Sequence, residues 1–135
     1  MSDYLRPEFS DDLQWISVLG LAHIGDAVFE LMVRTWLCTK RISTAKRLHN
    51  ETVEFVSARA QAAAAQSLIS ELNPEEYAVY KRGRNTQVNS VPRGSTFEEY
   101  HIATGIEALF GYLYLKGETV RIGELFEMII KLKEE

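Results

Sequence analysis

The sequence has little cysteine, since Cys38 is the only one among 135 residues. A lone cysteine cannot form an internal disulfide, which permits a reducing compartment. Cys38 also has no cysteine or histidine neighbour at the spacing of a zinc site. The chain must therefore fold by burying apolar side chains, and 46% of its residues are hydrophobic. This length and composition predict one compact domain over residues 1–135.

Long hydrophobic runs are absent as well. No stretch holds 18 apolar residues in a row, so we expect no membrane-spanning helix and no membrane partner. The N-terminus lacks the basic and then apolar pattern of a secretory signal, and it is too acidic for a transit peptide. We therefore expect a cytoplasmic protein, or one in an organellar stroma if a transit peptide has been removed.

Positive charge is in the minority, because 15 Lys and Arg stand against 19 Asp and Glu, a net charge of −4. Net acidity alone argues weakly against a nucleic-acid partner. The distribution matters more, because residues 78–97 contain no acid, and neither do residues 40–50. The first of these stretches carries four cations: Lys81, Arg82, Arg84 and Arg93. An acidic chain with two local basic segments can still bind a polyanion.

Helical periodicity of apolar residues runs through nearly the whole sequence, and no segment has the pattern of a strand. Ser10, Ser43 and Thr52 are plausible N-caps, and Asn73 and Thr96 each precede a Glu by three residues, as in a capping box. The pattern predicts an all-α domain of about seven helices. We expect them to start at Ser10 and to cover residues 21–37, 43–49, 52–72, 74–83, 96–115 and 119–132.

The segment from Asn85 to Gly94 is polar, has no period and contains Pro92, so we expect a loop. A loop of this length is unusual in a helical domain, and long loops are often functional. A merely tolerated surface loop is the alternative. The cations in and beside the segment favour contact with phosphate.

Two acids stand out because their neighbours are apolar or small: Asp26 and Glu107. A carboxylate in an apolar helix is costly unless it is paired, hydrogen-bonded or bound to a metal. Gly25 and Gly111 flank the two acids, and because glycine costs about 1 kcal/mol inside a helix, we expect close helix–helix approach there. If these helices cross, the carboxylates could share one hard cation such as Mg²⁺. Separate pairing with arginines, or a solvated rim, is an equally open interpretation.

Other candidate ligands are weaker. Glu30 lies one turn after Asp26 and could be a third acid, but it also precedes Arg34 by four residues, and we favour an ion pair. The three histidines have no metal-ligand spacing among them, and we interpret them as structural or surface residues.

Four segments are similar to one known family. Residues 21–31, with Gly-Asp-Ala at their centre, resemble its signature helix, and residues 104–115 resemble its second acidic helix. That family is ribonuclease III, and the similarity covers residues 19–115 in order. Residues 57–62 and 81–85, with the short chain that lacks a double-stranded-RNA-binding domain, resemble the Mini-ribonuclease III branch.

The resemblance implies a ribonuclease III-type endonuclease domain that works as a symmetric homodimer. It implies Mg²⁺-dependent hydrolysis of double-stranded RNA to 5′-phosphate ends, with Mn²⁺ as an alternative ion. Carried over by position, Asp26 and Glu107 are the catalytic, metal-binding acids. The branch is associated with maturation of large-subunit (23S) ribosomal RNA precursors, so a ribosomal protein is a further candidate partner. With Arg93 added from the charge pattern, the RNA-binding candidates are Lys81, Arg82, Arg84, Asn85 and Arg93.

The chain also departs from full-length members of the family. It has Leu19, Ala22 and Thr104 where they carry acids, and the Mini branch shares this reduced set. We therefore expect one firmly bound Mg²⁺, a second arriving with RNA, and Thr104 beside a water of the metal. The alternative function is a non-catalytic module of the same fold that binds structured RNA or the ribosome. A helical interaction protein without nucleic acid ranks last.

Overall fold

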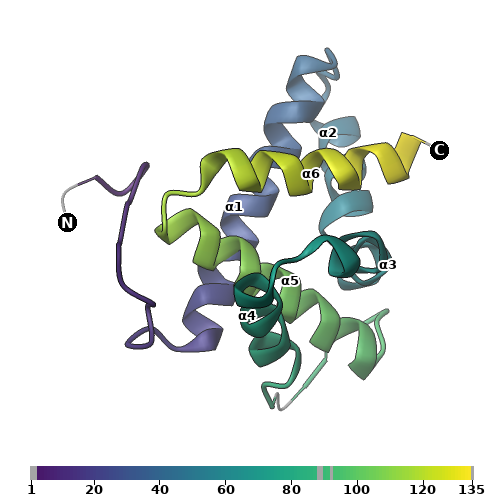
Figure 1. The fold of residues 1–135 in the computed structure, drawn as a ribbon. Coiled ribbons are helices and arrows are strands. Elements are labelled where there is room, and N and C mark those ends of the chain that lie inside the picture. The colour runs from purple at the N-terminus through teal and green to yellow at the C-terminus, as the bar shows by residue number, and fades with distance from the viewer. Residues whose placement is uncertain (1–2, 88–89, 92, 135) are drawn as a thin grey trace.

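The computed structural model describes residues 3–87, 90–91 and 93–134 (Figure 1). Within these residues the chain forms six α-helices and one 3-10 turn, with no strand, which confirms the predicted all-α class. None of the helices in the described part is long and apolar enough to cross a bilayer. The helices are α1 (Val18–Thr39), α2 (Ala45–Val56), α3 (Ala58–Leu68), η1 (Ile69–Glu71), α4 (Pro74–Arg84), α5 (Phe97–Leu115) and α6 (Thr119–Glu134).

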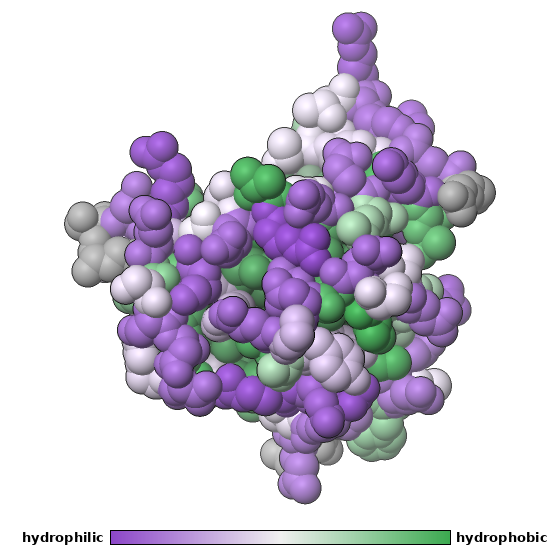
Figure 2. All heavy atoms as spheres, viewed as in Figure 1, coloured by the Kyte–Doolittle hydropathy of each residue, from purple (hydrophilic) through white to green (hydrophobic). Residues whose placement is uncertain are grey.

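Helix α5 forms the centre of the domain. Eleven of its 19 residues are buried, and it packs against α1, α3, α4 and α6. Figure 1 shows it running through the middle of the molecule, with α1 behind it and α4 in front. A helix that is apolar on nearly every side belongs in a core. By contrast, the face in Figure 2, over α4 and α6, is mainly hydrophilic.

Two glycines let the backbones of α1 and α5 touch. A Cβ added to Gly25 would lie 1.6 Å from the carbonyl oxygen of Glu107, and one added to Gly111 would lie 1.9 Å from that of Leu21. No side chain fits in either place, which accounts for glycine inside two long helices. The close crossing expected from the sequence is therefore present. It sets Asp26, the residue after Gly25, against the turn of α5 that carries Glu107.

A second glycine contact joins α4 to α5. A Cβ on Gly83 would lie 2.8 Å from the Cα of Gly105, and a Cβ on Gly105 would lie 2.7 Å from the carbonyl oxygen of Tyr80. The last turn of α4 is thus held against the first half of α5. Both the acid-bearing helix α1 and the basic end of α4 are positioned by the same central helix.

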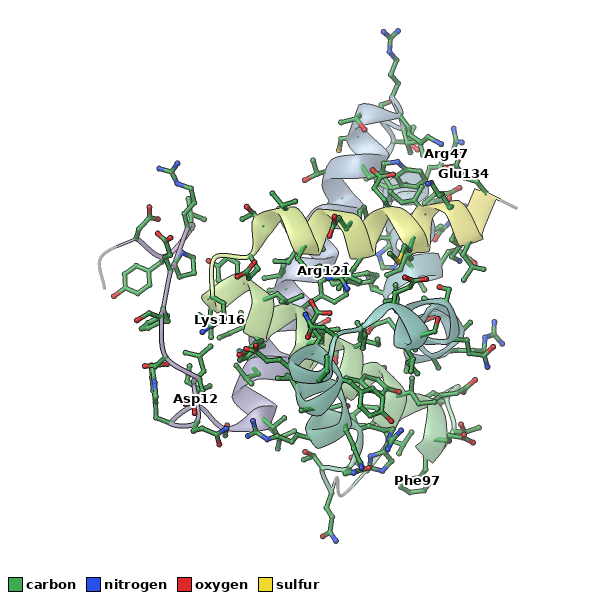
Figure 3. All side chains as sticks on the ribbon, viewed as in Figure 1. Asp12, Arg47, Phe97, Lys116, Arg121 and Glu134 are labelled. Atoms are coloured by element: carbon green, nitrogen blue, oxygen red, sulfur yellow. The ribbon has the colours of Figure 1, made fainter. Side chains whose placement is uncertain are left out.

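An ion pair fastens α6 to the start of α4. The guanidinium of Arg121 donates from Nε to Oε2 of Glu76 at 2.8 Å and from Nη2 to Oε1 at 2.9 Å. Figure 3 labels Arg121 where α6 passes α4. In its capping box the carboxylate of Glu76 also accepts a hydrogen bond from the backbone N–H of Asn73 at 3.0 Å. Because Glu76 is only 3% exposed, the bidentate pair leaves no buried charge without a partner.

Both predicted capping boxes are confirmed. The Asn73 side chain accepts the backbone N–H of Glu76 at 2.8 Å, and the reciprocal bond closes the box at the start of α4. Thr96 accepts the N–H of Glu99 at 3.0 Å, and Glu99 returns the bond at 2.9 Å at the start of α5. These starts are local in origin, so the sequence alone identifies them.

The helix predicted to start at Ser10 is absent. The side chains of Asp11 and Asp12 instead accept hydrogen bonds from the backbone N–H groups of Leu13 and Gln14, at 2.8 and 3.2 Å. Leu13 has a positive φ of 57°, which an α-helix does not allow. Aspartates that would favour the first turn of a helix here form local turns, because their short side chains compete for the backbone.

The prediction of a single helix over residues 52–72 is also wrong, because the range is divided among α2, α3 and η1. Thr52 lies inside α2, where its hydroxyl donates to the carbonyl oxygen of Leu48 at 2.7 Å. The chain then turns at Ser57, whose hydroxyl accepts the N–H of Ala60 at 3.2 Å and caps α3. The cap of α2 is Thr44, one residue after the predicted position.

We expect Gly25→Ala to lower the free energy of unfolding by about 3 kcal/mol, because the new methyl group meets backbone rather than a movable side chain. Urea unfolding followed by circular dichroism measures this. Gly123→Ala is the matched control: a Cβ there has no neighbour within 4 Å, so it should stabilise α6 by about 0.5–1 kcal/mol. Equal stability of Gly25→Ala and the wild type would contradict the close crossing.

Candidate active site

The α1–α5 crossing brings two carboxyl groups together. Asp26 extends from α1 and Glu107 from α5, and the two side chains are close enough to share a hydrogen bond. Asp26 is exposed, whereas Glu107 is half-buried. The pair therefore lies at the rim of the crossing, with one carboxyl open to solvent and the other set into the protein.

This arrangement changes the acidity of the inner carboxyl. Burial raises the pKa of Glu107 to about 8, and the charge and hydrogen bond of Asp26 act in the same direction. The amide of Gln61 opposes them by donating to the carboxylate. Two carboxylates this close do not both ionise at neutral pH unless a cation offsets their repulsion. The pair is thus a place where a metal ion could replace a proton.

Gln61 is a third member of the site, and our sequence analysis missed it. It extends from the first turn of α3 and is 1% exposed. Its Nε2 donates to the carbonyl oxygen of Val56 at 3.0 Å and to Oε2 of Glu107 at 3.4 Å. Its Oε1 is buried and has no hydrogen-bond partner among the residues that the structure describes. The available signal was a lone amide in the alanine-rich run of residues 60–65.

No third acid among the described residues joins the pair. Glu30 forms an ion pair with Arg34, as the spacing favoured. The hydroxyl of Thr104 is buried and donates to the carbonyl oxygen of Tyr100 at 2.9 Å, so its proton is used within its own helix. In the part of the chain that the structure describes, no three His, Cys, Asp or Glu side chains gather where they could hold a metal. Any ion here would take most of its ligands from water or substrate.

Four of the predicted RNA-binding residues lie together at the end of α4. Lys81, Arg82 and Asn85 are exposed, and Arg84 is half-buried with its guanidinium 5.7 Å from the ring centre of Tyr80. The Nε of Arg84 also donates to Oδ1 of Asn85 at 3.4 Å. Cations in the last turn of a helix are favoured by the partial negative charge of its free carbonyl groups. These four residues form an exposed basic knob at the C-terminal end of α4.

A hollow of about 530 Å³ opens beside this basic end of α4. Arg84 and Asn85 form one side, and Phe97 and His101 from the start of α5 form the other. The segment predicted as a loop continues from here, although Val88, Asn89 and Pro92 lie outside the described residues. A hollow lined by an arginine and an asparagine, next to exposed cations, suits part of a phosphate-bearing ligand.

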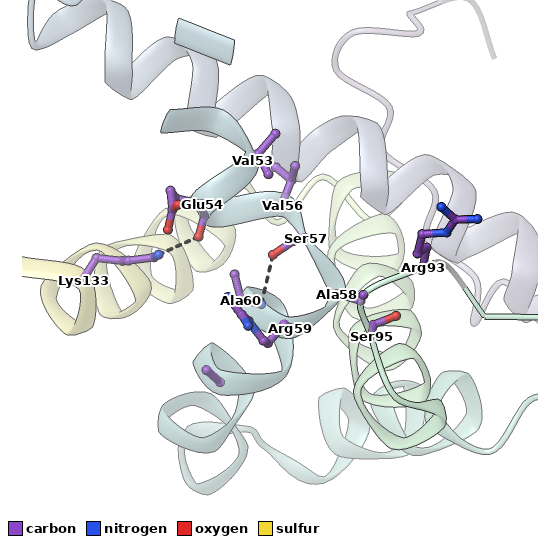
Figure 4. Close-up of a pocket in the computed structure, with 12 residues that line it drawn as sticks. Val53, Glu54, Val56, Ser57, Ala58, Arg59, Ala60, Arg93, Ser95 and Lys133 are labelled. Atoms are coloured by element: carbon purple, nitrogen blue, oxygen red, sulfur yellow. Dashed lines mark hydrogen bonds between the residues drawn. The ribbon is translucent and has the colours of Figure 1, made fainter. Parts of the chain in front are cut away.

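Arg93 lies apart from the other four. It lines a cleft of about 640 Å³ at the start of α3, together with Arg59 and Lys133 (Figure 4). Lys133 reaches this cleft from α6, and its Nζ donates to the carbonyl oxygen of Glu54 at 2.5 Å. Arg59 and Lys133 were not among the predicted residues. Lys133 lies in a segment with several glutamates near the end of the sequence, and our prediction from local net charge therefore passed over it.

Comparisons with known proteins find similar sequences and a similar fold. The Ribonuclease III domain family model matches residues 19–118, a range that contains both acids. The chain is 41% identical to the Mini-ribonuclease 3 of Clostridium tetani, over 98% of this chain and 89% of that protein. It is 36% identical to the Mini-ribonuclease 3 of Brevibacillus brevis, over 96% of each. A crystal structure of a Fusobacterium nucleatum protein is similar with a TM-score of 0.82 and 30% identity, over 90% of this chain and 99% of that one.

Without metal, we expect the free energy of unfolding to fall as pH rises from about 5 to 8. The folded chain keeps a proton on Glu107, whose pKa of about 8 lies above its ordinary 4.5, while the unfolded chain releases it. Stability must then decrease with pH, because the unfolded state binds fewer protons. Urea unfolding in chelator at several pH values measures this slope.

Glu107→Gln is the control for the pH series, because its amide has the same shape and does not titrate. The difference in stability between wild type and Glu107→Gln should change across this pH range. Parallel curves for the two proteins would show that Glu107 keeps an ordinary pKa.

Proposed function

The chain belongs to the ribonuclease III family and is an endoribonuclease, and on this premise we propose that it cuts double-stranded RNA with the help of Mg²⁺. The observation that carries the proposal is the pair of Asp26 and Glu107 at the α1–α5 crossing. The basic end of α4 packs against the same helix α5. Acids for a cation and cations for phosphate are thus held in a fixed relation to each other.

The acid pair fits a hydrated Mg²⁺. Two carboxylates supply the hard oxygen ligands that this ion prefers, and it keeps several waters. Gln61, whose Nε2 donates to Glu107, also carries a buried Oε1 without a partner among the described residues, and a water of the ion could satisfy this acceptor. Mn²⁺ accepts the same oxygen ligands and can stand in for Mg²⁺. When bound, the ion would act as a Lewis acid on the phosphodiester and on the attacking water. The proposed hydrolysis gives products with 5′-phosphate ends.

The role of the α4 residues is to bind phosphate. A-form RNA is recognised by its shape, its phosphates and its 2′-hydroxyl groups rather than by its bases. Lys81, Arg82, Arg84 and Asn85 offer exposed donors from a rigid helix end. Arg93 and Arg59 extend the basic surface to a second cleft at the start of α3. We propose that the duplex backbone contacts both places.

We further propose that two copies act together. The outer side of α1 carries an apolar stripe of Ile24, Ala27, Val28 and Leu31, which lines a hollow of about 460 Å³ with the N-terminal segment. Leu31 is 62% exposed. Monomers rarely leave a continuous apolar surface of this kind open. Because Asp26 lies next to Ala27, a symmetric dimer through this stripe would present two acid pairs, one for each strand.

For the cellular role we propose maturation of the large-subunit (23S) ribosomal RNA precursor in the cytoplasm. The proposal rests on the similarity to the Mini-ribonuclease 3 proteins over nearly the whole chain. Base-paired precursor ends offer the long duplex that a small domain without sequence readout can recognise by shape. A ribosomal protein bound to the precursor is the candidate partner that would select the cleavage position.

The wild-type chain should cut an RNA hairpin in Mg²⁺ but not in chelator, and should leave a DNA duplex of the same sequence intact. Asp26→Asn and Glu107→Gln should each lower kcat about 100-fold, because each removes a charge that holds the cation. Glu127→Gln on α6 is the matched control, since this exposed glutamate lies outside the site. Labelled RNA on denaturing gels gives the rates.

A wild-type chain that binds the hairpin without cutting it would favour the non-catalytic module instead. The absence of acids at Ala22 and Thr104 would then explain the lost reaction. Cutting that does not depend on Asp26 would contradict the placement of the metal.

Leu31→Glu should convert the dimer to a monomer at micromolar concentration, because a carboxylate would be buried in an apolar interface. Light scattering coupled to size exclusion measures the mass. Val120→Glu on α6 is the control, since Val120 is 77% exposed and lies away from the stripe. A monomeric wild type, or a dimeric Leu31→Glu, would refute this interface.

A further inference from the structure

We propose that Gln61 is a positioning residue that holds the Glu107 carboxylate toward Asp26 and prepares the acid pair for its cation. The inference rests on the proposed metal-dependent function and adds a residue from a third helix to it. Gln61 bonds to Glu107 but lies below the surface, at 1% exposure. It therefore acts through Glu107 rather than on RNA.

The orientation of the Gln61 amide is dictated by its two partners. Its Nε2 faces the carbonyl oxygen of Val56 at 3.0 Å and Oε2 of Glu107 at 3.4 Å, and both are acceptors. An amide turned over by 180° would set Oε1 against the carbonyl oxygen of Val56, which can only accept, and this contact is repulsive. The NH₂ group must therefore face the carboxylate, and it restricts where Oε2 can lie.

The backbone of Gln61 is fixed at the same time. Its N–H donates to the carbonyl oxygen of Ser57 at 3.0 Å, in the first turn of α3. The hydroxyl of Ser57 caps that turn by accepting the N–H of Ala60, as Figure 4 shows. An amide on a capped helix start is a firmer support for a carboxylate than one on a loop.

Packing alone does not require an amide here. The other buried residues of α3 are Ala62, Ala64, Ala65 and Leu68, so the buried face of the helix is otherwise apolar. Satisfying the last carbonyl of α2, at Val56, accounts for one donor of the amide. It does not account for the bond to Glu107 or for the buried Oε1 without a partner.

The unpartnered Oε1 of Gln61 is a second observation consistent with this role. A buried acceptor without a donor is costly, and such groups in native proteins generally have a functional reason. A Mg²⁺ ion held by the acid pair would keep several waters, and Oε1 could accept a hydrogen bond from one of them. Gln61 thus donates to Glu107 through Nε2, and its Oε1 would be free to accept from a water of a bound ion. Residues in such supporting positions are worth about 10–100-fold in metal affinity.

The test is Mn²⁺ binding to the full chain without RNA, measured by electron paramagnetic resonance of the free ion. Gln61→Met keeps the length and packing of the side chain but removes both hydrogen-bonding ends. We expect its dissociation constant for Mn²⁺ to rise about 10-fold or more. Gln66→Met, an exposed change on the same helix, should bind Mn²⁺ as the wild type does.

Kinetics separates positioning from a structural effect. Gln61→Met should lower kcat for an RNA hairpin and leave KM unchanged, and raising the Mg²⁺ concentration should restore part of the loss. Should circular dichroism show that Gln61→Met is unfolded, Gln61→Asn replaces it, because its shorter amide keeps a polar group without reaching both partners. The same loss of Mn²⁺ affinity is expected.

The outcomes distinguish this inference from the proposed function. Wild-type Mn²⁺ affinity in a folded Gln61→Met or Gln61→Asn overturns the role of Gln61, whatever the RNA assay shows. Weaker Mn²⁺ binding in a chain that never cuts RNA supports Gln61 and refutes the proposed reaction. A wild type that binds no Mn²⁺ overturns both.

Discussion

The backbone contact between Gly25 and the turn of α5 at Glu107 is the constraint on which the other features depend. Any side chain at Gly25 or Gly111 would separate the two helices, and the carboxyl groups would part with them. Because α5 also receives α4 through a glycine contact, the same helix fixes the distance from the acids to the basic knob. The same glycine contacts are therefore needed both for the stability of the core and for the geometry of the site.

Much of this was accessible from the sequence, because the signals were local or were costly residues in unexpected places. Glycine beside a lone acid in an apolar helix, as at Gly25 and Asp26, needs compensation, and close helix contact is the usual one. The capping boxes at Asn73 and Thr96 depend only on residues three positions apart. Such features mark where helices start and where two of them meet.

The features that the sequence did not predict depend on competition or on tertiary contacts. Whether Ser10 starts a helix was decided by Asp11 and Asp12, whose turns compete with the first helical bonds. Gln61 looked like an ordinary residue of an alanine-rich helix until the packing of α3 on α5 placed it against Glu107. Arg93 was grouped with the α4 cations because it is close in sequence, but it lines a different cleft. Position along the chain does not determine position in space across a turn of this length.

The placement of each acid relative to its glycine is a matter of helical phase. Asp26 follows Gly25 by one residue, about 100° around α1, so the glycine faces α5 while the carboxyl emerges at the side of the contact. On α5, Glu107 precedes Gly111 by four residues and shares its face. One alanine inserted between Gly25 and Asp26 would swing the carboxyl by about 100° around the helix without changing the charge or the helix content of the chain. Gly25 and Asp26 therefore have to be adjacent, because their adjacency sets the angle around α1 between the helix contact and the carboxyl. No substitution elsewhere in α1 can restore that angle once it is lost.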